Sequence, residues 1–285
     1  MKNKSFTLIE ILVVIIIVGL LAGLIIGATA SSIEEAKKTK SFAFSSDTKK
    51  ELMLNILQEW KFDEGSGTMT YDINKSSNSG ALVGFLSTVK GGGDNGASGW
   101  LSSKNCVSGT CLNFDGVNNS YVNNTDTGAL PLFTLTTWVY NVSGGQTRHS
   151  ILSHFWEVVN QNICFFSYSF ADDYWRETTN SKVAYNKWSY VVTVWNGSYI
   201  SHYVNGELAY KDPLTSSGTS ENLFNIAGYS GRIMKGRLDE MIIYNKNLST
   251  SEIKQNYLAG LNSLLAKGGI DEEEYNQRIE KLAEK

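Results

Sequence analysis

The chain has 285 residues, of which 42% are hydrophobic and 19% charged, and its formal net charge at pH 7 is −3. This length supports one large domain or two ordinary ones. The charge balance and the lack of a basic stripe exclude nucleic acid as an expected partner. Glycine is frequent (26 residues) and proline rare (2 residues), a composition that favours short strands joined by turns.

The N-terminal region contains an uninterrupted apolar segment. Residues 11–33 carry no charge, and as a helix they would extend about 35 Å, enough to cross a hydrocarbon core. Lys2 and Lys4 precede the segment, which by the positive-inside rule keeps the N-terminus cytoplasmic. A secretory signal peptide and a plain signal anchor are alternative interpretations. Neither explains Glu10 at the edge of the segment, because an unpaired carboxylate there is costly.

The stretch SFTLIEILVVIIIVGLLAGLIIG resembles the class III leader of type IV prepilins and type II secretion pseudopilins, over residues 1–30. The resemblance implies a leader at residues 1–5, cleavage by a prepilin peptidase between Ser5 and Phe6, and methylation of the new Phe6 amine. It also implies that Glu10 pairs with the amine of a neighbouring subunit inside a helical filament, which costs far less than an isolated charge. Ser5 departs from the family, in which glycine usually precedes the cleavage site.

The same resemblance predicts an N-terminal pilin helix over residues 6–57, with residues 8–30 in the membrane. Gly19, Gly23 and Gly27 recur every four residues and therefore share one face of this helix. Such a face lets helices approach closely in a filament. The alternative is that glycine is simply common in membrane helices.

Beyond the helix the sequence changes to short runs rich in β-branched and aromatic residues. Asn-Gly pairs at 196–197 and 205–206 separate three such runs, and this pair is a strong signal for a β-hairpin. The regular spacing predicts an antiparallel β-sandwich or jelly roll, so that the protein is mainly β with a long N-terminal helix and short C-terminal helices. Further predicted strands are 111–115, 120–123, 132–140, 150–155, 162–170, 223–228 and 235–244.

Five motifs in this region carry a second resemblance: EWKFDEGSGTMTYD, CLNFDGVNNSYV, FTLTTWVY, KWSYVVTVWNGSYISHYVNGELA and GRLDEMIIYNKNLSTSEIKQNY. They follow one another as in laminin-G-like domains of the concanavalin A-like lectin/glucanase superfamily. The resemblance implies a two-sheet jelly roll over residues 58–258 in which the first and last strands pair.

Two of the three cysteines are close in sequence. Cys106 and Cys111 flank the turn sequence VSGT, so they could face each other across a hairpin as a disulfide. The alternative is a pair of reduced thiols. A zinc site is not expected, because no second Cys or His pair stands at the required spacing.

Calcium is a candidate ligand, although no cofactor is required by the sequence. Several relatives hold a structural calcium ion where the terminal strands meet, and Asp63, Asp72 and Asp239 lie in motifs that could supply its oxygen ligands. The alternative is that these carboxylates cap turns or accept backbone hydrogen bonds.

Aromatic side chains are the candidates for ligand binding. Tyr140, Trp156, Tyr174 and Trp175 combine a flat ring with a polar tip, a combination that stacks on sugars. Packing of each ring in the core is the alternative. Tyr174 and Trp175 stand in DDYWR, where two carboxylates and an arginine indicate exposure.

Enzyme activity is not expected. The glucanases of the superfamily use closely spaced carboxylates on one strand, and no such arrangement occurs here. Asp239 and Glu240 are adjacent, and alternation along a strand would point them to opposite faces.

The C-terminal residues 259–285 return to a helical pattern, interrupted by glycines at 268–269. The portion LLAKGGIDEEEYNQRIEKL resembles the small helical-hairpin motif called SHOCT. We expect an accessory helical hairpin.

Taken together, these patterns predict a pilin-like filament subunit whose lectin-like head binds extracellular glycans or proteins. The alternatives are a type II secretion pseudopilin and a membrane-anchored glycoside hydrolase. Expected partners are other pilin subunits, the prepilin peptidase and, before assembly, the inner membrane. The expected location is first a single-pass position in the cytoplasmic membrane and then a cell-surface filament.

Overall fold

The structure is a computed structural model. It describes residues 12–13, 15–17, 52–74, 79–123, 131–144, 148–152, 156–159, 161–165, 176–177, 182–213, 225–228 and 231–283. The chain divides into two compact units, Met1–Leu54 and Asn55–Lys285.

In the first unit, residues 12–13 and 15–17 are helical, and residues 52–53 are helical at its end. Among the described residues, no helix has the length and apolarity that crossing a membrane requires. Ser5, Phe6, Glu10, Gly19, Gly23 and Gly27 lie outside the described residues. Strand β1 (Ile56–Trp60) begins at Ile56, inside the last residues of the range predicted for the helix.

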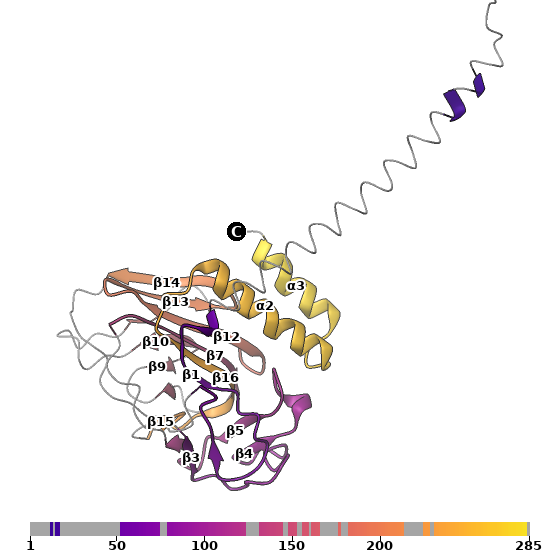
Figure 1. Cartoon of the computed structure of the whole chain (residues 1–285). Coiled ribbons are helices and arrows are strands. Elements are labelled where there is room, and N and C mark those ends of the chain that lie inside the picture. The colour runs from indigo at the N-terminus through magenta and orange to yellow at the C-terminus, as the bar shows by residue number, and fades with distance from the viewer. Residues whose placement is uncertain are drawn as a thin grey trace, which may run out of the picture. The chain divides into compact units, whose positions relative to one another are not determined.

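The second unit is a sandwich of two antiparallel sheets, as the sequence predicted (Figure 1). In the first sheet the order is β14 (Glu207–Pro213), β13 (Tyr199–Val204), β12 (Trp188–Trp195), β7 (Phe133–Asn141), β16 (Lys235–Tyr244), β5 (Cys111–Asp115) and β4 (Gly99–Leu101), and β1 also pairs with β16. In the second sheet it is β11 (Arg176–Glu177), β10 (Asn162–Phe165), β9 (Trp156–Val159), β8 (Arg148–Leu152), β15 (Asn225–Ile226), β6 (Tyr121–Asn123), β3 (Gly80–Val83) and β2 (Met69–Thr70).

The hydrophobic core lies between the two sheets. Strand β7 shows the period-2 pattern that builds it: Phe133, Leu135 and Val139 belong to the core, whereas Trp138 points to the opposite face. The predicted hairpin at residues 205–206 joins β13 to β14, with Asn205 and Gly206 both at positive φ (53° and 81°).

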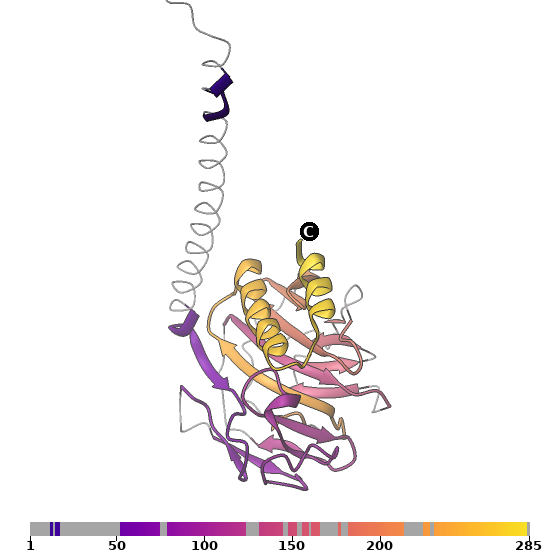
Figure 2. The same ribbon diagram turned by 90° about the vertical axis from the view of Figure 1, so that its right-hand side faces the viewer.

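Two helices cover the outer face of the first sheet (Figure 2). Helix α2 (Thr250–Ala266) begins with a capping box between Ser249 and Glu252. Its Tyr257 stacks on Trp138, with ring centroids 5.6 Å apart. Helix α3 (Glu272–Ala283) donates a hydrogen bond of 2.9 Å from Arg278 to the carbonyl of Trp188. The predicted domain boundary at residues 258–259 falls inside α2.

β16 organises the centre of the first sheet. One of its edges pairs with β7. Its other edge is shared by two strands: β5 pairs with residues 235–238, and β1 pairs with residues 241–244. The pairing of the first and last strands, which the resemblance implied, is therefore present. Residues 239–240 lie between the two partners, and this gap positions the candidate site.

Candidate functional site

A short disulfide-closed loop lies at the gap in β16. Cys106 and Cys111 form a disulfide with a Cα–Cα distance of 5.6 Å, and both residues are fully buried. The 3₁₀ helix η2 (Ser103–Asn105) precedes the loop, and β5 begins at Cys111. The predicted disulfide is thus confirmed, and we call residues 106–111 the cystine loop.

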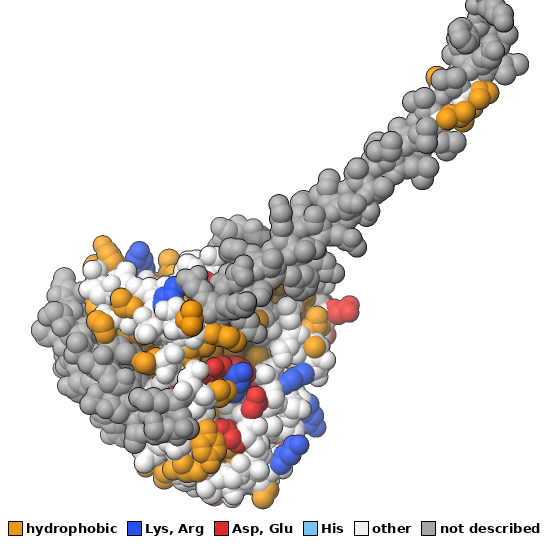
Figure 3. Space-filling model, in the orientation of Figure 1, with side chains coloured by type: hydrophobic (Ala, Val, Ile, Leu, Met, Phe, Trp, Pro, Cys, Tyr) orange, Lys and Arg blue, Asp and Glu red, His pale blue; other side chains and the backbone are white. Residues whose placement is uncertain are grey.

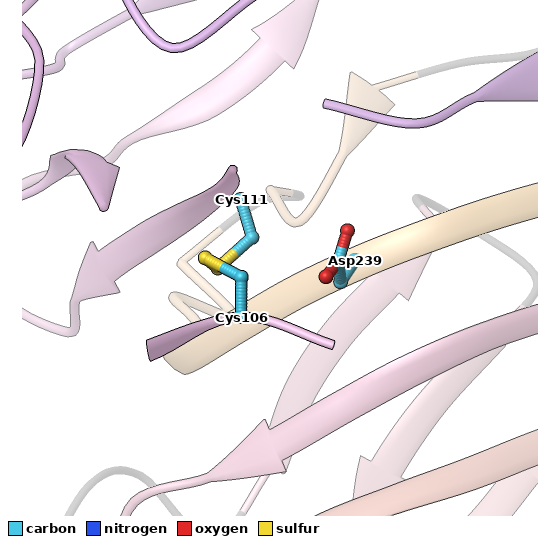
Figure 4. A group of neighbouring side chains, drawn as sticks. All are labelled: Cys106, Cys111 and Asp239. Atoms are coloured by element: carbon cyan, nitrogen blue, oxygen red, sulfur yellow. A yellow bond between two sulfur atoms is a disulfide. The ribbon is translucent and has the colours of Figure 1, made fainter. Parts of the chain in front are cut away.

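The Asp239 side chain of β16 lies beside the disulfide (Figure 4). It binds the backbone of the cystine loop. Its Oδ2 accepts hydrogen bonds from the N–H groups of Val107 and Ser108, at 2.8 and 3.0 Å, and its Oδ1 accepts one from the N–H of Glu240 at 2.9 Å. The residue is fully buried. Burial raises the pKa of Asp239 well above its ordinary value, and the charge of Glu240 adds to this effect.

Glu240 turns toward the same loop. Its φ is +49°, and the register between β16 and β7 shifts between Asp239 and Ile242. This bulge breaks the strand alternation, so the expectation that the two carboxylates point to opposite faces is wrong. The Ser108 side chain donates a hydrogen bond to Glu240. Burial raises the pKa of Glu240, against the opposing charge of Lys61.

The residues that follow β1 hold the other side of the cystine loop. Thr110 donates its N–H to Asp63 Oδ1 at 2.8 Å and its hydroxyl to the carbonyl of Phe62 at 2.7 Å. Gly109 is required beside them, because a Cβ at this position would overlap the Asp63 carboxylate. Figure 3 shows acidic and basic side chains gathered over β1 and β5 on this face of the head.

Asp63, Asp72 and Asp239, the predicted calcium ligands, each accept backbone N–H groups. Cys106, Cys111 and Asp239 lie close together, but the sulfurs are joined to each other and Asp239 accepts backbone hydrogen bonds with both oxygens. Asp72 Oδ1 accepts the N–H groups of Glu59 and Asn74, each at 3.0 Å. These carboxylates therefore take the alternative role of binding backbone N–H groups.

The aromatic candidates separate clearly. Trp156 is fully buried and belongs to the core between the sheets, so for this residue the alternative of core packing holds and it is not a ligand-stacking candidate. Tyr140 is partly exposed, with the Arg237 guanidinium 4.4 Å from its ring centroid and the Trp188 ring edge-on at 5.6 Å. Tyr174 and Trp175 lie outside the described residues.

Sequence reasoning missed Gly109, Thr110 and Glu240. A glycine between two cysteines indicates a turn, but it does not identify the Asp63 carboxylate as the group that needs the space. Glu240 carried no local signal, because nothing in DEMIIY marks a bulge.

Comparisons with known proteins agree with two of the three resemblances, those to prepilins and to laminin-G-like domains; the resemblance to SHOCT stays a prediction. Residues 1–26 match the family model described as the prokaryotic N-terminal methylation motif, and residues 115–254 match the concanavalin A-like lectin/glucanases superfamily. Asp239 lies inside the second match, whereas the cystine loop lies outside it. A search of curated proteins finds no significant match.

Solved structures with a similar fold are distant in sequence. The binding domain of Paraclostridial Mosquitocidal Protein 1 has 13% identity and a TM-score of 0.54, over 74% of this chain and 53% of that chain. Domain 4 of AbnA, a GH43 extracellular arabinanase from Geobacillus stearothermophilus solved with arabinotriose, has 14% identity and a TM-score of 0.51, over 70% and 97%. The receptor binding domain of botulinum neurotoxin mosaic serotype C/D has 12% identity and a TM-score of 0.50, over 73% and 51%.

This chain thus spans about half the length of the mosquitocidal-protein and neurotoxin chains. At these identities the likeness concerns the fold alone. The chain carries a prokaryotic N-terminal methylation motif at residues 1–26 and, at residues 115–254, a domain of the concanavalin A-like lectin/glucanase type.

Proposed function

We propose that this protein is a type IV pilin-like filament subunit whose lectin-like head binds extracellular glycans or proteins. The observation that carries the proposal is the presence, in one chain, of the methylation motif at residues 1–26 and the lectin-like match at residues 115–254. The N-terminal segment with the motif assembles subunits into a filament, and the lectin-like domain presents a binding surface outside the cell.

The N-terminal segment would act through a charge pair. Cleavage between Ser5 and Phe6 creates an amine that becomes methylated, and Glu10 of a neighbouring subunit neutralises it. A desolvated carboxylate without such a partner is strongly unfavourable in an apolar bundle, so the pair fixes the axial position of one subunit against the next. Gly19, Gly23 and Gly27 would let the helices approach closely. Before assembly the subunit would span the cytoplasmic membrane once, and prepilin peptidase would be its first partner.

The head would act as a binding module and not as an enzyme. The relatives in fold include a domain solved with arabinotriose, the binding domain of a mosquitocidal protein and the receptor binding domain of a neurotoxin, which supports a role in recognising sugars or receptors. The carboxylates next to the cystine loop hold its conformation. Asp239 accepts hydrogen bonds from backbone N–H groups, and Glu240 accepts one from the Ser108 side chain. Tyr140, Tyr174 and Trp175 are the residues proposed to contact the ligand.

The test begins with the mature protein. Mass spectrometry of the subunit isolated from cells is expected to give an N-terminus at Phe6 carrying a methyl group. Labelling with an antibody against the head is expected to decorate surface filaments, and those filaments are expected to bind to a glycan array. Short periplasmic filaments would indicate a pseudopilin instead. An N-terminus other than Phe6 would overturn the filament proposal.

A further inference from the structure

The cystine loop connects four segments that are far apart in the sequence. Within the head it contacts the end of β1 through Phe62 and Asp63 and contacts β16 through Asp239. It continues covalently into β5 at Cys111. From the helical side, Ser263 donates its hydroxyl to the carbonyl of Val107, and Lys267 Nζ donates to the carbonyl of Gly109 at 3.4 Å.

β1 is the strand that receives the chain from the N-terminal unit. It has five residues and, among the described strands, pairs only with β16. Its start is held by the N–H of Asn245, which donates to the carbonyl of Asn55 at 3.0 Å. Its end is held by Thr110, through Phe62 and Asp63. Between these ends, Glu59 donates its N–H to Asp72 and accepts the N–H of Ile73, and Trp60 is buried in the core. A short strand at the edge of a fold opens more readily than a central one, so the end contacts add to these interactions in holding β1.

Closure of the disulfide prepares the loop for both sets of contacts. The six residues from Cys106 to Cys111 must hold Val107 and Ser108 toward Asp239 and, at the same time, Thr110 toward Asp63. A closed ring of this size has few conformations, so its amides are already positioned when β1 arrives. An open chain of reduced thiols would lose conformational entropy on adopting the same shape.

We propose that the cystine loop is a latch that docks β1 firmly only when the disulfide is formed, so that oxidation of Cys106 and Cys111 precedes secure attachment of the head to its N-terminal segment. In that oxidation the two thiols lose two protons and two electrons to a partner that bears a disulfide and is itself reduced to a dithiol. The latch stands on contacts within the head. Its consequence for a filament, in which tension enters the head at β1, rests on the proposed function.

The first experiment measures hydrogen exchange in the full chain purified in detergent. Peptides that cover residues 56–62 are followed by mass spectrometry in the wild type, in Cys106→Ser/Cys111→Ser and in Thr110→Val. Thr110→Val keeps the disulfide and the shape of the side chain but removes the hydroxyl that donates to Phe62. We expect β1 amides to exchange at least tenfold faster in both variants, while β12 amides keep their protection. Unchanged exchange in β1 would overturn the latch, and so would a uniform loss of protection in β1 and β12.

The second experiment uses the buried disulfide as a reporter. Both cysteines have 0% exposure, so dithiothreitol reduces the bond only after the loop opens. Asp63→Ala is expected to accelerate the reduction at least tenfold. Asp115→Ala is the matched control, because Asp115 also accepts backbone N–H groups, from Val117 and Asn118, but does so in the turn that follows β5. Equal rates for wild type and Asp63→Ala would overturn the proposal, whether or not the protein forms filaments.

Discussion

The carboxylate of Asp63 occupies the space beside Gly109 in which a side chain would have to begin. In the same position it accepts the N–H of Thr110 at 2.8 Å. We therefore expect Gly109→Ala to force Asp63 away from the loop and to lower the free energy of unfolding by about 1–3 kcal/mol. Urea denaturation of the full chain measures this change.

A double-mutant cycle separates this clash from a general effect of alanine. In Asp63→Ala the space beside residue 109 is open, so adding Gly109→Ala should cost much less than it does in the wild type. Gly269→Ala is a control, since its Cβ would approach only the flexible end of Leu264 closely. Additive losses in the double variant would show that the Asp63 carboxylate is not what excludes a side chain.

Gly260 lets helix α2 lie close to the first sheet. A Cβ on Gly260 would overlap the indole ring of Trp138, which stacks on Tyr257 of the same helix. Alanine favours a helix over glycine by about 1 kcal/mol, yet we expect Gly260→Ala to destabilise the head by about 1–3 kcal/mol. The comparison is with Gln255→Ala on the same helix, measured by thermal and urea unfolding. A stabilised Gly260→Ala variant would mean that propensity outweighs the contact with Trp138.

Some structural elements could be predicted from residues adjacent in the sequence, and others could not. Asn205 and Gly206 predicted their hairpin because the turn depends on two adjacent residues that tolerate positive φ. The turn between Cys106 and Cys111 is also local, and it made a disulfide one of two alternatives. Reduced thiols were the other. The pairing of β1 with β16 came from the resemblance to laminin-G-like domains and not from the residues themselves.

The site depends on contacts that no local pattern contains. Thr110 is 47 residues from Asp63, and Val107 is 132 residues from Asp239. The bulge at Glu240 reverses the direction that simple alternation assigns to its side chain. Trp156 was a candidate for ligand binding with core packing as the alternative, and no local pattern distinguished the two; the structure places it in the core.

Asp239 gives the head a pH dependence whose sign follows from its burial. Its pKa is raised above the ordinary 3.8, so the folded state keeps a proton that the unfolded chain has already released. The associated stability is fully present below pH 3.8 and is lost as the pH rises through the folded pKa. Relative to Asp239→Asn, the wild type should therefore lose stability with rising pH, by at most about 1.4 kcal/mol per pH unit.

Urea unfolding at steps between pH 3 and 8 measures this difference, with Asp115→Asn as the control of opposite sign. Burial alone would raise the pKa of Asp115, but hydrogen bonds from Val117 and Asn118 outweigh it and lower the pKa. Its stability is present above pH 3.8 and is lost as the pH falls through the folded pKa. Parallel curves for wild type and Asp239→Asn across the range would contradict the raised pKa.

The aromatic candidates give a test of ligand binding. Replacement of Tyr174 and Trp175 by alanine is expected to weaken binding of the intact filament to its glycan about tenfold per ring, without changing the free energy of unfolding. Trp156→Ala should do the opposite and cost about 3–5 kcal/mol of stability, because the ring is fully buried in the core. The measurements are glycan-array binding and urea unfolding of the same preparations. Undiminished binding after loss of both candidates would move the ligand site elsewhere on the head.

Glu10 tests the filament proposal itself. If its carboxylate neutralises the Phe6 amine of a neighbour, removing the charge leaves that amine unpaired in an apolar bundle at a cost of roughly 2–3 kcal/mol per subunit. Glu10→Ala and Glu10→Gln should both reduce incorporation into filaments more than tenfold, while cleavage before Phe6 continues. Thr7→Ala, close by in the sequence, keeps the charge pair and should assemble normally. Quantitative immunoblotting of sheared filaments and of membranes measures the distribution, and normal incorporation of Glu10→Gln would show that shape and not charge sets the position of each subunit.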